Sequence, residues 1–206
     1  MIRLSPFSLF EFKNDVDILV NTINTKGYMG KGLAFEFALR YPEMEKEYKE
    51  KCLKKEIKPG KIWFWEDKEI IANFPTKDDY KYPSKIEWIS SGLIDLKEYI
   101  IKNKIKKIAL PMLGSGLGGL NWRIVEKEIV EKLFDLDAEI IICLDFQAGE
   151  KEKTGIENAL YELSDANIIK TNPLFGSNIK INRFREIMKI KGVGKKRYKY
   201  LLNKYF

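Results

Sequence analysis

Two kinds of hydrophobic pattern alternate along the chain. Apolar runs rich in β-branched residues cover residues 17–23, 61–65, 69–74, 107–113 and 139–146. Several of these runs are continuous instead of alternating, which is typical of strands buried on both faces. Helical patterns lie between them at residues 32–40, 42–55, 84–103 and 122–134. Strands that alternate with helices predict an α/β sandwich with a mostly parallel central sheet.

Helix-end and turn signals give the expected boundaries. Pro42 suits the first position of a helix, and Ser84 with Glu87 three residues later has the order of a capping box. The polar stretch 147–154 follows the last strong strand, so we expect a first domain at residues 1–154. A helix at 155–163 and a turn-rich connector at 172–178 make a second segment, 155–179, and a compact basic unit follows at 180–206.

The length and hydropathy of the chain suit a globular protein. Its 206 residues, 45% of them hydrophobic, are enough for one ordinary domain and a small appendage. No apolar run approaches the roughly 20 residues that cross a bilayer. The N-terminus has no charged segment followed by an apolar segment and a cleavage site. We therefore expect a cytoplasmic protein without a membrane partner.

The residue types restrict the possible chemistry. Cys52 and Cys143 are far apart in sequence and the chain has no histidine, so a Cys/His zinc site, a disulfide framework and a histidine base are all excluded. We expect no metal and no cofactor. Any catalysis must use lysine, carboxylates, amides or bound water.

Two glycine-rich loops each follow a predicted strand and precede a helix. The first strand ends in the amides Asn21 and Asn24, and its loop contains three glycines within residues 27–32. The second loop has four glycines within residues 114–119. Each glycine costs backbone entropy when it is ordered, and the close approach of an anion to the backbone is a reason to have them. A tight turn is the alternative for either loop alone. Together they predict a crevice for a diphosphate at the carboxyl ends of the strands.

Residues 21–32, 73–77 and 113–120 resemble the three signature blocks of macrodomains, over about residues 1–150. More narrowly, they are similar to the branch that contains terminal ADP-ribose glycohydrolases and the DarG antitoxins that remove ADP-ribose from DNA. The resemblance implies a three-layer α/β/α fold with a mixed sheet and a cleft for ADP-ribose over the two loops. The residues expected to bind ADP-ribose are Asn21, Asn24, Lys26, Gly27, Met29, Gly30, Gly32, Thr76, Gly114, Ser115, Gly116, Leu117, Gly118 and Gly119.

The resemblance also implies which residues are catalytic. Lys77 matches the lysine that acts at the anomeric carbon of the distal ribose in the related glycohydrolases, and Asn24 is expected to contact that ribose. Protein-directed relatives have an acidic residue where this chain has Gly118, which favours a DNA substrate. Near the N-terminus, where macrodomains commonly have an aspartate that contacts adenine, this chain offers Ser8.

The C-terminal segment is strongly basic and resembles a helix-hairpin-helix motif. The chain carries a net charge of +7, and residues 180–206 contain a Gly-Val-Gly turn followed by a basic helix. Such a turn directs backbone N–H groups at a phosphate. An ordinary helical hairpin that caps the domain is the alternative. The residues expected to contact DNA are Gly192, Gly194, Lys195, Lys196 and Arg197.

These observations predict an enzyme that hydrolyses the bond between ADP-ribose and a DNA base. Its expected partners are ADP-ribose, ADP-ribosylated DNA and a cognate DNA ADP-ribosyltransferase toxin. Two alternatives stay open: a non-catalytic reader of ADP-ribose, and a glycohydrolase that acts on ADP-ribosylated protein carboxylates.

Overall fold

The computed structural model describes residues 1–169 and 181–206. The connector expected at 172–178 lies outside the described residues. The contacts divide the chain into two compact units. Unit 1 contains Met1–Ser5 and Phe12–Leu144, and unit 2 contains Pro6–Glu11 and Asp145–Phe206. A domain boundary near residue 154 stays a prediction. Within the described ranges, no helix is long and apolar enough to span a membrane.

Unit 1 is built on a six-stranded sheet with the order β1-β6-β5-β2-β4-β3. All neighbours are parallel except β3 and β4, which are antiparallel. The expected mostly parallel, mixed sheet is therefore confirmed. The strands are β1 (Ile2–Ser5), β2 (Ile18–Asn24), β3 (Trp63–Glu66), β4 (Ile70–Lys77), β5 (Lys107–Pro111) and β6 (Glu139–Cys143).

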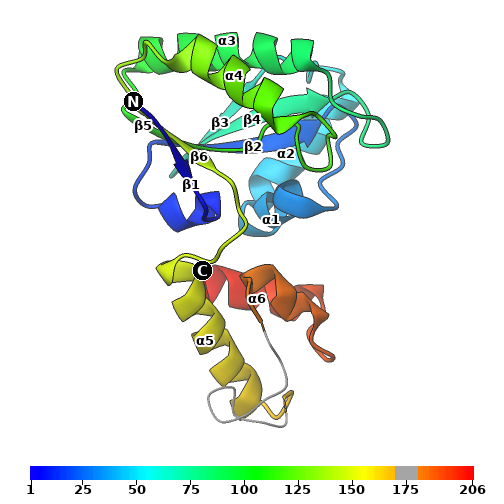
Figure 1. Cartoon of the computed structure of the whole chain (residues 1–206). Helices are drawn as coiled ribbons and strands as arrows, with labels where there is room; N and C mark the ends of the chain where they lie inside the picture. Colours follow the sequence, from blue (N-terminus) through cyan, green and yellow to red (C-terminus); the bar gives the residue numbers. More distant parts are fainter. Residues whose placement is uncertain (170–180) are drawn as a thin grey trace. The chain divides into compact units, whose positions relative to one another are not determined.

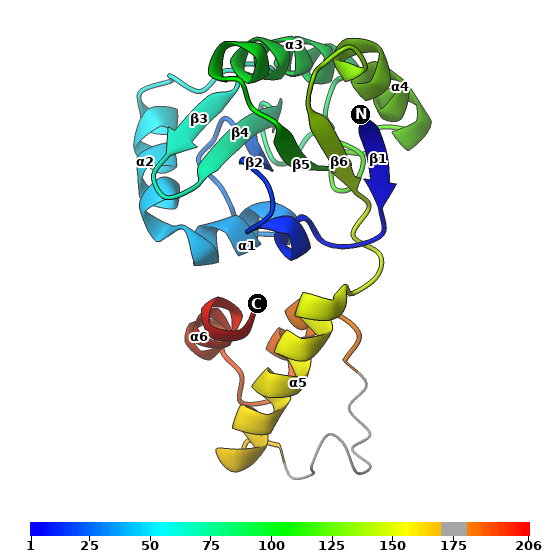
Figure 2. The same cartoon turned by 90° about the vertical axis from the view of Figure 1, so that its left-hand side faces the viewer.

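Helices cover both faces of this sheet, as the three-layer prediction requires (Figure 1). The helices α3 (Ile86–Asn103) and α4 (Trp122–Leu133) lie on one face. On the other face lie α1 (Gly32–Arg40) and α2 (Pro42–Leu53), as the second view also shows (Figure 2). Helix α2 begins at Pro42, so the expected role of this proline is confirmed.

The core explains why the strands are apolar on both faces. Successive strand side chains point to opposite faces, so Val20 and Phe74 face the α3 layer, where they pack in one buried cluster with Leu93 and Ile129. Gly92 on α3 allows the Phe74 ring to pack closely, since a Cβ atom there would lie 2.3 Å from the ring. This packing anchors β2 and β4 against the α3 layer.

Several expected element ends differ in the structure. Ser84 does not cap α3, which begins at Ile86 after Lys85 and has no side-chain cap. Ser84 is instead buried against the glycine-rich loop that precedes α4, and its N–H donates to the Gly118 carbonyl. The strand expected at 107–113 ends at Pro111, where the chain turns into that loop. The strand expected at 139–146 ends at Cys143, because the chain soon leaves the extended conformation at Asp145, with a φ of 58°.

Unit 2 is helical. It contains α5 (Glu150–Asp165), the 3-10 helix η2 (Phe184–Lys189) and α6 (Lys195–Tyr205), while the 3-10 helix η1 (Leu9–Phe12) spans the division between the units. The helix expected at 155–163 starts five residues earlier than predicted. The Glu11 carboxylate accepts hydrogen bonds from the N–H groups of Lys151, at 2.6 Å, and Glu152, at 3.1 Å. This cap comes from a segment about 140 residues away, so local sequence could not reveal it.

A buried ion network joins α5 to η2. The Arg183 guanidinium donates to both oxygens of Glu152, each at 3.0 Å, and also pairs with Asp145. The Glu152 side chain is only 2% exposed, and it also accepts a hydrogen bond from the Phe184 N–H at 2.8 Å. Arg183 therefore links the start of η2 to α5.

Candidate functional site

The loop after β2, residues 25–31, is called the first glycine loop, and the Asn24 side chain organises it. Asn24 Oδ1 accepts hydrogen bonds from the N–H groups of Lys26, at 2.8 Å, and Tyr28, at 3.4 Å. Its Nδ2 donates to the Tyr28 carbonyl at 2.7 Å, and the buried Tyr48 hydroxyl bonds the Asn24 carbonyl at 2.7 Å. Because an amide nitrogen has two hydrogens, Asn24 retains one donor for a ligand.

The first glycine loop leads directly into α1. Gly27 and Gly32 have φ angles of +76° and +58°, a region that favours glycine. Helix α1 begins at Gly32, and no side-chain hydrogen bond caps it in the described structure. The first N–H groups of an uncapped helix suit a phosphate group. The backbone here therefore has the features expected of an anion site.

Paired strands bring the two proposed catalytic residues together. Asn21 lies opposite Asn73 in the register of β2 and β4, and Asn24 lies opposite Lys77. The register shifts between Ile23 and Asn24, so that the buried Thr76 is the extra residue. An irregularity of this kind changes the direction in which the side chains beyond it point. Asn24 and Lys77 consequently lie side by side at the carboxyl edge of the sheet.

Asn21 has a different environment from Asn24. It is fully buried, and its Nδ2 donates to Asn73 Oδ1 at 2.9 Å. The remaining amide atoms, Asn21 Oδ1 and Asn73 Nδ2, have no partner among the described residues. In this structure Asn21 joins β2 to β4, and its predicted contact with ADP-ribose stays a prediction.

Lys77 reaches from the end of β4 to the loop that precedes α4. Residues 113–120 are called the second glycine loop, and Lys77 Nζ donates to the Leu117 carbonyl at 2.5 Å. Partial burial lowers the pKa of the Lys77 ammonium, because desolvation disfavours the charged form. The Leu117 side chain approaches Gly32, where a Cβ atom would lie 3.5 Å from its Cδ1. Lys77 and Leu117 thus lie where the two glycine loops approach each other.

The second glycine loop contains a tightly packed part and an open part. A Cβ atom at Gly118 would lie 2.1 Å from the Gly114 carbonyl oxygen and 2.5 Å from Ser84 Oγ. The Ser84 N–H donates to the Gly118 carbonyl at 2.9 Å. By contrast, nothing described lies within 4 Å of a Cβ atom at Gly116. An acidic side chain at Gly118 does not fit this loop as it stands.

The other predicted ligand residues lie in the same two loops. Met29 is buried, while Lys26 and Gly30 are exposed. In the second loop the Ser115 hydroxyl donates to the Leu113 carbonyl at 3.3 Å, and the exposed Gly119 has a φ of +76°. The structure therefore gathers the predicted residues around one edge of the sheet.

Sequence reasoning missed one link between the first glycine loop and the turn after β4. The Thr25 hydroxyl lies 2.6 Å from Asp78 Oδ1 and 2.7 Å from the Asp78 carbonyl, and the Thr25 N–H donates to that carbonyl at 3.1 Å. The hydrogen bond from Thr25 lowers the pKa of Asp78 below its usual range. These bonds join the first glycine loop to the residues after Lys77. No local pattern signals them, because the two residues are far apart in sequence.

The C-terminal residues predicted to contact DNA lie in unit 2. Gly192 has a φ of +92°, Gly194 is the N-cap of α6, and both are exposed. Lys195, Lys196 and Arg197 are also exposed in the first turn of α6. The element before the turn is the short 3-10 helix η2, and Tyr198 is buried, with its ring centroid 6.2 Å from that of Phe184.

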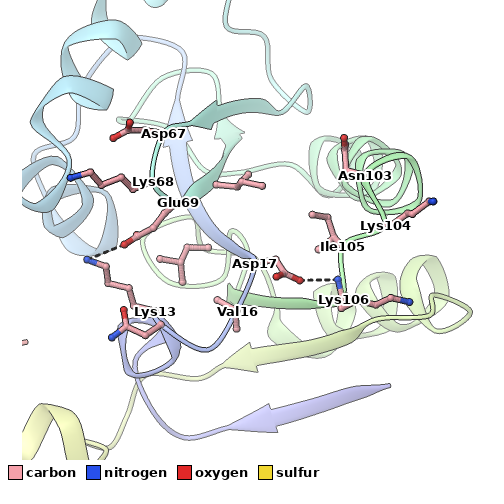
Figure 3. Close-up of a pocket in the computed structure, with 13 residues that line it drawn as sticks. Lys13, Val16, Asp17, Asp67, Lys68, Glu69, Asn103, Lys104, Ile105 and Lys106 are labelled. Atoms are coloured by element: carbon pink, nitrogen blue, oxygen red, sulfur yellow. Dashed lines mark hydrogen bonds and ion pairs between the residues drawn. The ribbon is translucent and has the colours of Figure 1, made fainter.

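A separate cleft lies at the amino ends of the strands in unit 1. It encloses about 680 Å³ and is lined largely by charged residues (Figure 3). Lys13 pairs with Glu69 at 3.2 Å, and Asp17 accepts a hydrogen bond from the Lys106 N–H at 2.8 Å. Its thirteen described lining residues include none of the predicted ligand residues. Neither in this cleft nor anywhere else in the described ranges are three cysteine or carboxylate side chains grouped so that they could hold a metal ion.

Comparison with known protein sequences identifies relatives of this arrangement. A DNA ADP-ribosyl glycohydrolase of Mycobacterium tuberculosis is 42% identical over 134 residues, which cover 61% of this chain and 38% of that protein. A DNA ADP-ribosyl transferase-DNA ADP-ribosyl glycohydrolase fusion protein of Thermosipho africanus is 34% identical over 153 residues, which cover 65% of this chain and 39% of the relative. The chain therefore matches about two fifths of the length of these relatives.

Solved structures agree with the sequence relatives. The macrodomain of Thermus aquaticus DarG is 36% identical, with a TM-score of 0.65 over 70% of this chain and 98% of that one. Thermosipho africanus DarTG in complex with ADP-ribose is 32% identical, with a TM-score of 0.65 over 69% of this chain and 41% of that one. The model of the Macro domain family matches residues 20–129, a span that includes both glycine loops and Lys77. The chain belongs to the Macro domain family.

Proposed function

We propose that this chain is an ADP-ribosyl glycohydrolase that removes ADP-ribose from a DNA base. The observation that carries the proposal is the meeting of Asn24 and Lys77 at the sheet edge, where Lys77 reaches the second glycine loop. Relatives that share this part of the chain are named DNA ADP-ribosyl glycohydrolases.

In the proposed complex, the diphosphate lies between the two glycine loops. Its oxygens accept hydrogen bonds from loop N–H groups and from the uncapped start of α1. The distal ribose lies beside Asn24, whose second Nδ2 hydrogen is free to donate. This arrangement directs the anomeric carbon of that ribose toward Lys77.

The reaction breaks the bond between the anomeric carbon and the base nitrogen. Water supplies the oxygen that becomes bonded to the carbon, and its proton replaces the sugar on the base. Lys77 acts as a neutral amine, either by attacking the carbon or by accepting the proton of the attacking water. Its lowered pKa makes the neutral amine more accessible. The diphosphate stabilises the positive charge that develops on the sugar.

We further propose that the turn between η2 and α6 binds the DNA strand. Gly192 and Gly194 offer backbone N–H groups, and the exposed cations of the first turn of α6 add sequence-independent attraction to phosphates. A DNA ADP-ribosyltransferase is the proposed partner, because the Thermosipho africanus relative carries both activities in its name.

The central test is single-turnover incubation of the full chain with an ADP-ribosylated oligonucleotide and, separately, with an ADP-ribosylated protein. The proposal expects release of ADP-ribose from the oligonucleotide. Release only from the protein would instead support action on carboxylate esters. Binding of ADP-ribose without release from either substrate would support a reader.

A further inference from the structure

Two exposed tyrosine rings lie side by side next to the proposed ADP-ribose site. Tyr28 belongs to the first glycine loop and Tyr80 to the turn after β4. Their ring centroids are 4.8 Å apart and their planes are tilted by 34°. The two residues are 53% and 45% exposed, so much of each ring faces solvent. Large aromatic side chains that remain together at a surface indicate a binding role.

The position of Tyr28 is fixed by the proposed catalytic residue Asn24. The Asn24 side chain bonds both the carbonyl and the N–H of Tyr28, at 2.7 Å and 3.4 Å. The Tyr28 ring then lies against Gly30, where a Cβ atom would be 2.4 Å from the ring. Any side chain at Gly30 would displace the ring. The Tyr28 ring is therefore held beside the place where the distal ribose is proposed to lie.

The position of Tyr80 is fixed from the other side. The bonds between Thr25 and Asp78 hold the start of the turn against the first glycine loop. Asp79 then closes the turn, since its side chain accepts from the Lys81 N–H at 2.9 Å and its carbonyl from the Tyr82 N–H at 3.2 Å. Separate hydrogen bonds thus bring the two rings together.

Several lysines lie around the pair, together with the carboxylates of Asp78 and Asp79. Lys81 Nζ lies 5.7 Å from the centroid of the Tyr80 ring, and Lys81 and Lys85 are exposed. Lys26 is exposed as well, and its Nζ lies 3.5 Å from Asp78 Oδ1. Exposed aromatic rings beside lysines are the combination that proteins use for single-stranded nucleic acid, in which rings stack on bases and cations attract phosphates.

We propose that Tyr28 and Tyr80 form a stacking surface for an unpaired base of the DNA strand that carries the modification. Lys81 and Lys85 attract the phosphates on either side of that base. The surface prefers single strands, because the bases of a duplex are already stacked on one another. This inference rests on the proposed function for the identity of the strand, although the stacking itself requires no hydrolysis.

The test is binding of an unmodified single-stranded oligonucleotide to the full chain, measured by fluorescence anisotropy. Tyr80→Ala should weaken binding by about 5- to 100-fold, and Tyr80→Phe should stay close to the unmutated protein, because the ring is retained. Tyr161→Ala removes a tyrosine of similar exposure from α5 and should leave the affinity unchanged. Unchanged affinity in Tyr80→Ala, or equal affinity for a duplex of the same sequence, would overturn the proposal.

The same series is repeated in a chain with alanine at Lys195, Lys196 and Arg197, so that contacts from unit 2 do not mask the loss. Calorimetry with free ADP-ribose should give the same affinity for Tyr80→Ala as for the unmutated protein. If the protein releases ADP-ribose but its affinity for single strands does not depend on Tyr80, only the stacking surface is refuted. If its affinity for single strands depends on Tyr80 but it releases no ADP-ribose, only the glycohydrolase proposal is refuted.

Discussion

Lys77 Nζ donates a hydrogen bond to the carbonyl oxygen of Leu117 at 2.5 Å, and so joins the end of β4 to the second glycine loop. The two residues are forty positions apart in the chain. A lysine that bonds a loop carbonyl is held in place before a ligand arrives. This contact places the amine at the edge of the proposed diphosphate path.

Lys77→Ala should retain binding of ADP-ribose but lose hydrolysis by about 10²-fold or more, since loop backbone holds the diphosphate and the amine acts on the sugar. Single-turnover release from a modified oligonucleotide is measured beside calorimetric binding of free ADP-ribose. Lys68→Ala, an exposed lysine that lines the amino-end cleft, is the matched control and should keep full activity. Full activity of Lys77→Ala would refute the catalytic role.

The pH dependence should reveal which form of Lys77 acts. Burial lowers its pKa below the ordinary value of 10.5. If the neutral amine is the nucleophile or base, the single-turnover rate rises as the pH approaches that lowered pKa from below and levels off above it. A rate that falls over the same range would mean that Lys77 acts as a cation. The pH–rate profile of Lys77→Ala should lack this rise in rate.

Gly118→Asp should damage the second glycine loop, because its Cβ atom would lie 2.1 Å from the Gly114 carbonyl oxygen. We expect the free energy of unfolding to fall by about 1–3 kcal/mol, as for other overpacked positions, and ADP-ribose affinity to fall as well. Gly116→Ala is the control for stability alone, since a Cβ atom there meets nothing described within 4 Å. Urea unfolding and calorimetry measure the two effects. Equal stability of the two variants would contradict this account of the loop.

Glu152→Ala should be strongly destabilising, because it leaves the buried Arg183 without one of its carboxylates. Breaking a buried ion pair from one side costs about 3–5 kcal/mol. Urea unfolding of the full chain measures this change. Glu150→Ala, whose side chain is 88% exposed and pairs with Lys153, should change stability by only about 0–1 kcal/mol. Similar losses of unfolding free energy in the two variants would show that the burial of Glu152 does not decide its contribution to stability.

Replacing Lys195, Lys196 and Arg197 by alanine should weaken DNA binding and make it less dependent on salt. Each lost phosphate contact should reduce the slope of log affinity against log salt concentration by about 0.7 to 0.9. Anisotropy titrations at several salt concentrations give this slope, and binding of free ADP-ribose should be unaffected.

The charge-matched control for that variant replaces three exposed lysines of unit 1, namely Lys46, Lys54 and Lys102. These lysines lie on or beside α2 and α3, away from the turn between η2 and α6 in sequence. If this control lowers the slope as much as the first variant, net charge alone is responsible and the turn has no specific part in DNA binding.

The sequence by itself determined the order of five of the six strands of unit 1 and of the helices between them, because hydrophobic periodicity is a local property of the chain. It predicted α1 with the correct ends and identified Pro42 as the first residue of α2. The two glycine loops were also evident, since a cluster of glycines after an apolar strand is a local signal. The order and spacing of the motifs around Asn24, Lys77 and Gly118 pointed to the Macro domain family.

Only the tertiary structure decided the contacts between distant segments. Ser84 has the sequence pattern of a helix cap, but it packs against Gly114 and Gly118 because the second glycine loop lies there. Helix α5 starts early because Glu11 caps it from the far end of the sequence. The pairing of Tyr28 with Tyr80 depends on Thr25 and Asp78 in the same way. Hydrogen bonds and packing between segments far apart in the chain leave no periodic trace in sequence, so three-dimensional structure is needed to find them.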